Sequence, residues 1–520
     1  MSDTVESAEQ VSAEGSRELK RSLARALRAQ KMRALAMIAP LLLFILVTFI
    51  APIADMLFRS VENEIVSETL PLTVDALDDW SYASGEAPSE TVFAAFYYDM
   101  FVASELKEHT RLGSRLNYET TGISSLFRKS GRRVERFDTD IYADQFKALD
   151  PAWVKPATWV ALSEALDDDP EALPETAGAL AGFERMVEAD GDTLAETKPA
   201  DILFTALYRD LAAGANGPEG DLAPMFAQAK SAVGSFKSVS IRDQFTDIDK
   251  GWLDPEVWGT IKAYAPTVTP GYFLTAVDYK LSPAGIVPQP DDQAIYLKLF
   301  WRTLVMSLTI TVSCILLGYP VAYLLANLPM RTSNLLMILV LLPFWTSLLV
   351  RTSAWKVLLQ NQGVINDILV WAHIISEDGR LALINNQTGT IIAMTHILLP
   401  FMILPMYSVM QTIPPAYMRA AKSLGATDWT AFWRVYFPQS VPGIGAGSIL
   451  VFILAIGYYI TPELVGGTTG TFISNRIAYH ISSSLNWGLG AALGTILLAA
   501  VMLLYWAYDK IVGIDNVKLG

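Results

Sequence analysis

Six runs of about twenty apolar residues constrain this chain more than any other feature of its sequence. They occupy residues 35–57, 301–326, 334–357, 388–411, 441–463 and 487–508. An α-helix needs about 20 apolar residues to cross a bilayer, and within lipid only helices and closed barrels satisfy every backbone hydrogen bond. We therefore expect an all-α membrane protein with six transmembrane helices. The first run is long for a signal peptide, so we expect a retained anchor.

The basic residues predict the orientation. Seven Lys and Arg residues lie between positions 17 and 33, and cytoplasmic segments carry an excess of positive charge. Residues 1–34 are therefore expected to be a cytoplasmic tail and 35–58 the first transmembrane helix. Six crossings then place the basic loop 412–440 and the tail 512–520 in the cytoplasm, with helices 2–6 in residues 299–511.

Residues 59–298 form a single acidic block. They hold 40 Asp and Glu against 21 Lys and Arg, whereas the rest of the chain holds 13 against 18. Apolar residues in this block recur at helical spacing, so we expect a mainly helical extracytoplasmic domain without an internal repeat of fixed period. The net charge of −14 argues against nucleic acid as a partner, because phosphate binding needs a basic surface.

The sequence contains no recognisable catalytic, metal or cofactor site. It has no G-x-x-x-x-G-K-[ST] phosphate loop and no G-x-S-x-G elbow, so neither route to catalysis is available. Its four histidines lie far apart, which excludes a helical pair of metal ligands. We expect His396 to bond a neighbouring helix. The only cysteine, Cys314, excludes a disulfide framework.

The most informative segment is the loop between the fourth and fifth runs. Its first half is predicted to be a short helix that Gly425 stops. Thr427 or Asp428 then caps a second short helix, which we expect to end at Pro438. One reading is an interfacial amphipathic loop. Docking of a cytoplasmic partner fits better, because the small residues Ala420 and Ala421 with Gly425 permit close backbone approach.

This loop resembles the signature E-A-A-x3-G-x9-I-x-L-P of permease subunits of bacterial binding-protein-dependent ABC importers. Two alanines, the glycine and the proline stand in register, whereas an arginine replaces the glutamate, a valine the isoleucine and a phenylalanine the leucine. The resemblance assigns the ATPase-coupling loop to Arg419, Ala420, Ala421, Gly425, Asp428, Val435 and Pro438. The stretches YPVAYLLANLP, LLPFWTSLLVRTSAWKVLLQNQGVIND and GYYITPELVGG narrow the resemblance to spermidine/putrescine-type permeases.

The resemblance implies the fold of a type I ABC importer permease, with the acidic block as an insertion between helices 1 and 2. It implies a multi-pass protein of the bacterial inner membrane that works with ABC ATPase subunits, a second permease subunit, an extracytoplasmic solute-binding protein and membrane lipid. ATP hydrolysis would belong to the partner chain, so this chain is not expected to be an enzyme. The implied solute is small, with a polyamine favoured.

Polar and aromatic residues near the ends of two runs are candidates for the solute pathway, because a polycation prefers a carboxylate and aromatic faces. These candidates are Trp345, Arg351, Trp355, Tyr458, Tyr459 and Glu463. In the alternative interpretation, Arg351 and Glu463 pair with each other or extend to the interface. The aromatic residues would then belong to an interfacial belt.

Two other functions remain open from the residues alone. A membrane receptor or sensor with a ligand-binding outer domain would need a cytoplasmic output domain, and the longest predicted cytoplasmic segment is the tail 1–34. A secondary transporter would need inverted repeats or unwound helices, and the sequence shows no such symmetry. Co-isolation of an ATPase would separate an importer from both alternatives.

Overall fold

The computed structural model describes residues 30–512, so most of the two predicted cytoplasmic tails lies outside the described residues. The chain divides into two units at Arg59 and Ser60. The first unit is one apolar helix, Gln30–Arg59, which includes a π-helical turn, η1 (Leu46–Ile50), and α2 (Ala51–Arg59). This helix is long enough to span a membrane, which confirms the first predicted run.

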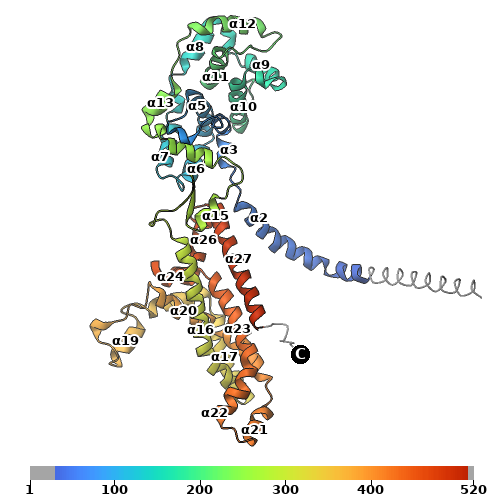
Figure 1. Ribbon diagram of the computed structural model, residues 1–520, viewed down its shortest axis with the longest axis vertical. Coiled ribbons are helices and arrows are strands. Elements are labelled where there is room, and N and C mark those ends of the chain that lie inside the picture. Colours follow the sequence, from blue (N-terminus) through green and yellow to red (C-terminus); the bar gives the residue numbers. More distant parts are fainter. Residues whose placement is uncertain (1–29, 513–520) are drawn as a thin grey trace, which may run out of the picture. The chain divides into compact units, whose positions relative to one another are not determined.

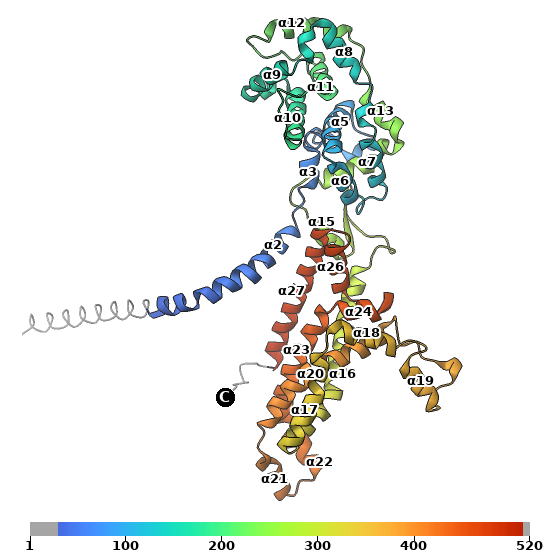
Figure 2. The same cartoon turned by 180° about the vertical axis from the view of Figure 1, so that it is seen from behind.

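In the second unit, four further helices are long and apolar enough to cross a membrane. They are α16 (Tyr296–Asn327), α20 (Gln387–Gln411), the helix Asp428–Gly457 that contains α23 (Phe437–Gly457), and α27 (Trp487–Val512). Figures 1 and 2 both place α16, α20 and α23 side by side. Their buried apolar residues form one cluster that includes Ile310, Met402 and Val451.

The third apolar run is broken. It forms α17 (Met330–Trp345) and α18 (Leu348–Leu358), which are bent by 94°. Ser347 adopts an extended backbone and its side chain accepts a hydrogen bond from Val350 N–H, which starts α18 as a separate helix. Counted as one span, the bent pair raises the number of candidate spans in the described part of the chain from five to six, in agreement with the six predicted runs.

The fifth helix begins and ends earlier than predicted. It starts at Asp428 and stops at Gly457. The expectation that Pro438 ends the second short helix of the loop is wrong, because that helix continues through Pro438 into α23. The π-helical turn η9 (Phe432–Tyr436) ends two residues before this proline, and Phe437 N–H donates to Phe432 O. The wider turn accommodates a residue that has no N–H to donate, so the chain continues as a helix.

Short elements complete the apolar part of the second unit. They are α19 (Val364–Trp371), the 3₁₀ turn η8 (Glu377–Gly379), α21 (Pro415–Ser423), α22 (Asp428–Ala431), α24 (Ile460–Val465), α25 (Gly467–Gly470) and α26 (Ile473–Ser482).

The acidic block folds around its own hydrophobic cluster, which runs from Val66 to Ala265. The block is helical apart from one antiparallel ribbon, which confirms the prediction of a mainly helical domain. Its α-helices are α3 (Ile65–Thr69), α4 (Pro71–Ala76), α5 (Glu90–Glu105), α6 (Glu108–Leu116), α7 (Ile123–Gly131), α8 (Asp140–Leu149), α9 (Pro156–Asp168), α10 (Pro174–Ala189), α11 (Asp201–Ala212), α12 (Ala223–Ala232), α13 (Ile241–Ile248), α14 (Pro255–Ala263) and α15 (Gly271–Ala276). Its 3₁₀ turns are η2 (Tyr82–Ser84), η3 (Val134–Arg136), η4 (Pro151–Val154), η5 (Pro170–Ala172), η6 (Val233–Ser235) and η7 (Lys250–Leu253). In the ribbon, β1 (Tyr279–Ser282) pairs with β2 (Gly285–Pro288), and Tyr279 lies opposite Pro288.

This domain contains a duplication without a fixed period, because its matching segments lie at two different spacings. Residues 142–162 match residues 241–261 without a gap, at a spacing of 99 residues. The identical pairs are Asp144 and Asp243, Gln145 and Gln244, Phe146 and Phe245, Asp150 and Asp249, Trp153 and Trp252, Pro156 and Pro255, and Trp159 and Trp258. Residues 70–77 (LPLTVDAL) likewise match residues 173–180 (LPETAGAL). The spacing is far longer than the 20–50 residues of solenoid repeats, and the match is weak outside these segments.

Matching residues make matching hydrogen bonds in the two repeats. In each repeat an indole N–H donates to the carbonyl of the preceding tryptophan, and a threonine hydroxyl donates to a buried aspartate that caps a helix. The distances are 2.8 Å for Trp159 to Trp153, 2.7 Å for Trp258 to Trp252, 2.6 Å for Thr73 to Asp99 and 2.7 Å for Thr176 to Asp210. Burial raises the pKa of Asp99 to about 7.

The two repeats exchange their last helices. The ring of Phe93 in the first repeat lies 4.8 Å from that of Trp258 in the second, and the ring of Phe204 in the second lies 5.2 Å from that of Trp159 in the first. Figures 1 and 2 accordingly show α8 and α9 with α10 and α11, and α13 with α5. Each half of the domain therefore combines the first helices of one repeat with the last helices of the other.

Residues from Tyr272 onward connect the acidic domain to the apolar helices, and Leu281 of β1 still packs against the hydrophobic cluster of the acidic domain. Tyr272 and Ala276 of α15 share a hydrophobic cluster with Leu489 and Leu493 of α27. The acidic domain is tied to this cluster by Arg115, whose Nε donates to the Tyr272 hydroxyl at 3.0 Å. Its guanidinium also pairs with Glu119 at 2.7 Å.

Candidate coupling loop and solute pathway

The loop between α20 and α23 is built around Gly425. This glycine has φ +87°, in the left-handed region, directly after α21. Gly425 N–H donates to Lys422 O at 3.0 Å and Ala426 N–H donates to Ala421 O at 3.1 Å. These two bonds form a Schellman motif, which satisfies carbonyls at the helix end and reverses the chain. The predicted helix stop is confirmed.

The second helix of the loop starts at Asp428, and the structure shows which of the two candidate residues, Thr427 or Asp428, caps it. The Thr427 hydroxyl accepts from Thr430 N–H at 3.3 Å and therefore caps α22. The Asp428 carboxylate instead pairs with Lys422 across the turn. This ion pair links the end of α21 to the start of α22 across the turn.

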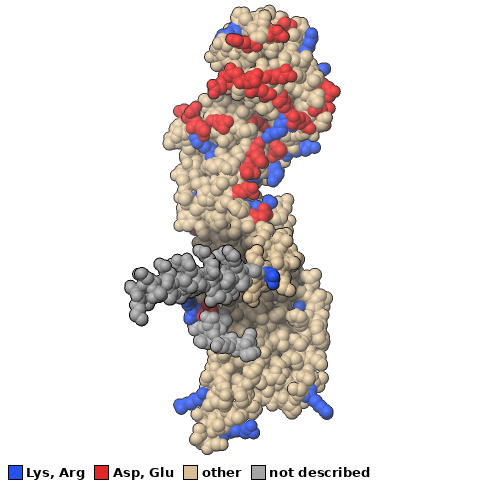
Figure 3. Space-filling model, turned by 90° about the vertical axis from the view of Figure 1, so that its right-hand side faces the viewer, with Lys and Arg blue, Asp and Glu red and all other residues tan. Residues whose placement is uncertain are grey.

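Large apolar side chains are exposed on this loop. Leu424 is 89% exposed and Trp429 is 71% exposed, although such residues are normally buried. Figure 3 shows Lys and Arg near the end of the molecule that carries α21 and α22, whereas Asp and Glu gather over the acidic domain. Of the signature residues, Arg419, Ala420 and Pro438 are exposed, and Val435 is half-buried. The arrangement offers an apolar surface with a basic rim.

The second candidate site surrounds the break after the fifth helix. Tyr458 and Tyr459 form a non-helical link between Gly457 and α24, and Tyr458 has an extended backbone. Asn475 holds this link because its Nδ2 donates to Tyr459 O at 2.9 Å and to Glu463 Oε2 at 2.6 Å. Glu463 is exposed, so its other carboxylate oxygen is open to a ligand.

The broken third run lies against this second break. The hydroxyls of Thr352 in α18 and Thr461 in α24 are 3.2 Å apart and buried. Trp355 Nε1 donates to His396 Nδ1 at 3.0 Å, which confirms that His396 bonds a neighbouring helix. Non-helical backbone at membrane depth is tolerated only where protein or a water-filled cavity surrounds it. At the two breaks, α18, α20 and α24 contact one another through hydroxyl, indole and imidazole groups.

The structure brings together only some of the predicted pathway residues. Arg351 and Glu463 form no ion pair in the described part of the chain, so their predicted alternative of pairing is wrong. The Nε of Arg351 is buried without a hydrogen-bond partner. Trp345 ends α17 and is 70% exposed, as an interfacial residue would be. Sequence reasoning missed Asn475, because a single amide carries no recognisable pattern.

Comparison with known proteins identifies the family. Residues 296–512 match the family described as binding-protein-dependent transport system inner membrane component. The spermidine/putrescine transport system permease protein PotB of Salmonella typhimurium strain LT2 is 34% identical over 220 residues, which cover 42% of this chain and 76% of the relative. The chain belongs to this permease family. It is an ABC importer permease subunit and a multi-pass inner-membrane protein.

Two other relatives by sequence agree with this assignment. PotB of Haemophilus influenzae is 36% identical over 220 residues, covering 42% of this chain and 76% of the relative. The inner membrane ABC transporter permease protein YdcU of Escherichia coli is 29% identical over 277 residues, covering 50% and 88%. A chain of a bacterial alginate ABC transporter, solved with an alginate pentasaccharide-bound periplasmic protein, aligns over 43% of this permease and 80% of its own length, at 18% identity and a TM-score of 0.36. The family match begins at residue 296 and leaves residues 59–295 of the acidic block outside it.

Proposed function

We propose that this permease forms the translocation pathway for a small organic cation, with a polyamine favoured, and couples that pathway to a separate ATPase subunit. The names of the PotB relatives support the solute class, because they describe spermidine/putrescine transport. The observation that carries the proposal is the exposed Glu463 carboxylate beside the non-helical link at Tyr458 and Tyr459.

The chemistry of this region suits a cation. Asn475 occupies one Glu463 oxygen and fixes the orientation of the carboxylate. Tyr459 is 46% exposed and offers an aromatic face. A carboxylate and an aromatic face together attract an ammonium group more strongly than either does alone. Arg351 and Trp355 would border the pathway on α18 and orient the solute, with Trp345 at its margin.

The loop around Gly425 is proposed to dock the ATPase subunit. Exposed Leu424 and Trp429 would insert into an apolar groove of that subunit, since aromatic anchors dominate most protein interfaces. The rigid turn formed by Gly425 and by the Lys422–Asp428 ion pair would pass ATPase closure to α23, because η9 connects the loop to that helix without a gap.

We further propose the remaining partners and the topology. A second permease subunit would complete the pathway, an extracytoplasmic solute-binding protein would deliver the solute, and membrane lipid would cover the apolar helices. Residues 59–298 would then lie outside the cytoplasm, where the acidic domain meets the solute-binding protein. Labelling of single cysteines in intact cells should reach Asp168→Cys from outside and not Gly425→Cys. Protection of position 168 would contradict this topology.

Uptake tests the proposed pathway. The permease is reconstituted into liposomes with its ATPase, its partner permease and its solute-binding protein, and ATP-dependent uptake of radiolabelled putrescine and spermidine is measured. Glu463→Gln should reduce uptake about tenfold or more, because it removes a charge-assisted contact. The matched control Asp378→Asn neutralises an exposed carboxylate outside the proposed pathway and should transport normally. Equal uptake by both variants would contradict a role for Glu463.

A further inference from the structure

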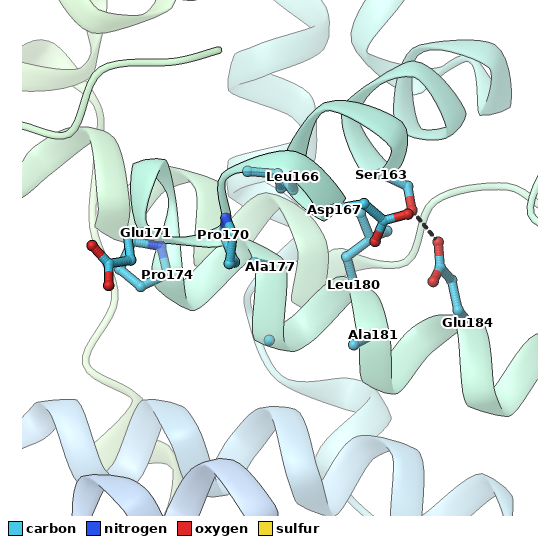
Figure 4. A pocket seen from close by; sticks show the side chains of 11 residues that line it. Ser163, Leu166, Asp167, Pro170, Glu171, Pro174, Ala177, Leu180, Ala181 and Glu184 are labelled. Atoms are coloured by element: carbon cyan, nitrogen blue, oxygen red, sulfur yellow. Dashed lines mark hydrogen bonds between the residues drawn. The ribbon is translucent and has the colours of Figure 1, made fainter.

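The acidic domain carries a groove between α9 and α10, with a volume of about 510 Å³. Its lining includes three carboxylates, Asp167, Glu171 and Glu184, and no Lys or Arg. Figure 4 shows Asp167 and Glu184 on one side of the groove, where the Ser163 hydroxyl donates to Glu184 Oε1 at 2.5 Å. The carboxylates alone say little about a ligand, but the duplication supplies an internal comparison.

The other half of the domain has an equivalent place between α14 and α4. The match of Trp159 to Trp258 aligns α9 with α14, so Lys262 stands where the groove has Ser163. The match of residues 70–77 to residues 173–180 aligns α4 with the start of α10. Leu77 and the residue after it therefore correspond to Leu180 and Ala181, which line the groove.

In that half, the equivalent place is filled by a primary ammonium group. Lys262 Nζ donates to Leu77 O at 2.7 Å, to Asp78 O at 3.1 Å and to Trp80 O at 2.7 Å. A lysine ammonium has three N–H donors, and here all three are used. In one of the two repeats, therefore, the position equivalent to the groove is occupied by the ammonium group of a lysine side chain.

The groove differs from this arrangement for a structural reason. Helix α4 ends at Ala76 and leaves carbonyl oxygens free beyond it, whereas α10 continues to Ala189 and uses those carbonyls within the helix. Asp167 and Glu184 stand in the groove instead and offer carboxylate oxygens, which are stronger acceptors for an ammonium. With a serine in place of Lys262, no side chain of the lining supplies the cation.

We propose that the groove binds a primary ammonium group of a small organic amine. Glu184 and Asp167 accept its N–H donors, Glu171 adds negative charge at the other end, and Leu166 and Leu180 contact the alkyl part. This site does not rest on the proposed transport activity, because binding to it needs neither ATP nor a partner subunit. A diamine such as putrescine is the simplest probe of this chemistry.

Binding of radiolabelled putrescine to the purified full-length permease in lipid nanodiscs tests the site. Equilibrium dialysis at low ionic strength is performed in the Glu463→Gln background, which removes the pathway contact proposed above. Ser163→Lys should fill the groove as Lys262 fills its counterpart, and should weaken putrescine binding about tenfold or more. The matched control Ala161→Lys adds the same charge at an exposed position of α9 outside the groove lining, and should change binding less than about twofold.

Two further measurements make the result decisive. Glu184→Gln keeps the shape of the groove and should also weaken binding, with an unchanged melting temperature showing that the domain remains folded. Butylamine should compete with putrescine, whereas tetramethylammonium, which has no N–H donor, should not. The proposal is overturned if putrescine fails to bind at millimolar concentration, if Ser163→Lys and Ala161→Lys weaken binding equally, or if tetramethylammonium competes as well as butylamine.

Discussion

Replacement of Gly425 should uncouple the ATPase from the pathway in graded steps. The glycine has φ +87°, and a Cβ added there would meet no atom within 4 Å. The cost of a side chain therefore comes from the left-handed backbone alone and not from a clash. For a residue such as alanine this cost is roughly 1–2 kcal/mol, which lowers the population of the folded turn about 5- to 30-fold.

The chemical nature of the replacement should set the order of the effect. Asparagine tolerates the left-handed region better than alanine does, and a β-branched residue tolerates it least. Uptake and solute-stimulated ATPase activity should therefore fall in the order Gly, Asn, Ala, Val at position 425. Membrane insertion should stay unchanged, because the turn lies outside the apolar helices. Gly425→Asp should be worse than Gly425→Asn, since it also adds a charge beside Asp428.

The assay compares these variants with Gly234→Ala. Gly234 also has open space around its Cβ position, but its φ does not lie in the left-handed region. The Gly234→Ala variant therefore measures the effect of an added methyl group without the free-energy cost of a left-handed backbone. The reasoning is refuted if Gly425→Ala couples as well as Gly234→Ala, or if the asparagine variant is less active than the alanine variant.

Four other changes test separate parts of the structure. Arg419→Glu should leave uptake nearly unchanged, because the exposed Arg419 side chain stands where the family signature has glutamate; a large loss would show that its charge contacts the ATPase. Asn475→Ala should lower the apparent affinity for the solute, since it removes the hydrogen bonds that hold Glu463 and the link at Tyr459, and unchanged uptake kinetics would contradict this role. Burial raises the pKa of Asp99 to about 7, so the folded state holds this proton more tightly than the unfolded state. The free energy of unfolding should therefore fall as pH rises from about 4 to about 7, and Asp99→Asn should flatten that dependence in chemical denaturation. Deletion of residues 65–268 should reduce uptake most at low ionic strength if the acidic domain attracts a cationic solute, because screening shortens its field to about 10 Å at 0.1 M salt; a defect independent of salt would indicate docking instead.

The sequence by itself determined the class of fold and the family. Apolar runs of bilayer length predict membrane helices wherever they occur, because unsatisfied backbone groups are excluded from lipid. The spacing from Ala420 to Pro438 was sufficient to indicate the permease family, and Gly425 to predict the turn. These features are local, so each can be recognised within about twenty residues.

The tertiary structure alone decided where the helices break. Runs of bilayer length include Thr346 and Gly457, but the chain bends after Trp345 and leaves the helix after Gly457. Contacts from distant segments stabilise these breaks, such as the hydrogen bond from Asn475 to Tyr459 O. The helix end expected at Pro438 is also absent, because a π-helical turn allows the helix to continue through a residue that normally ends one.

The duplication shows the same division between local and distant information. Its two copies share few residues, and those lie 99 or 103 residues apart, so a search for a short period does not detect them. The equivalence becomes plain only when Trp153 and Trp252 are seen to accept the same indole hydrogen bond. Because the copies exchange helices, Ser163 and Lys262 occupy equivalent positions, but Ser163 lies beside α10 and Lys262 lies beside α4. Sequence determines which side chains are present, and packing between distant segments determines which of them remain open to a ligand.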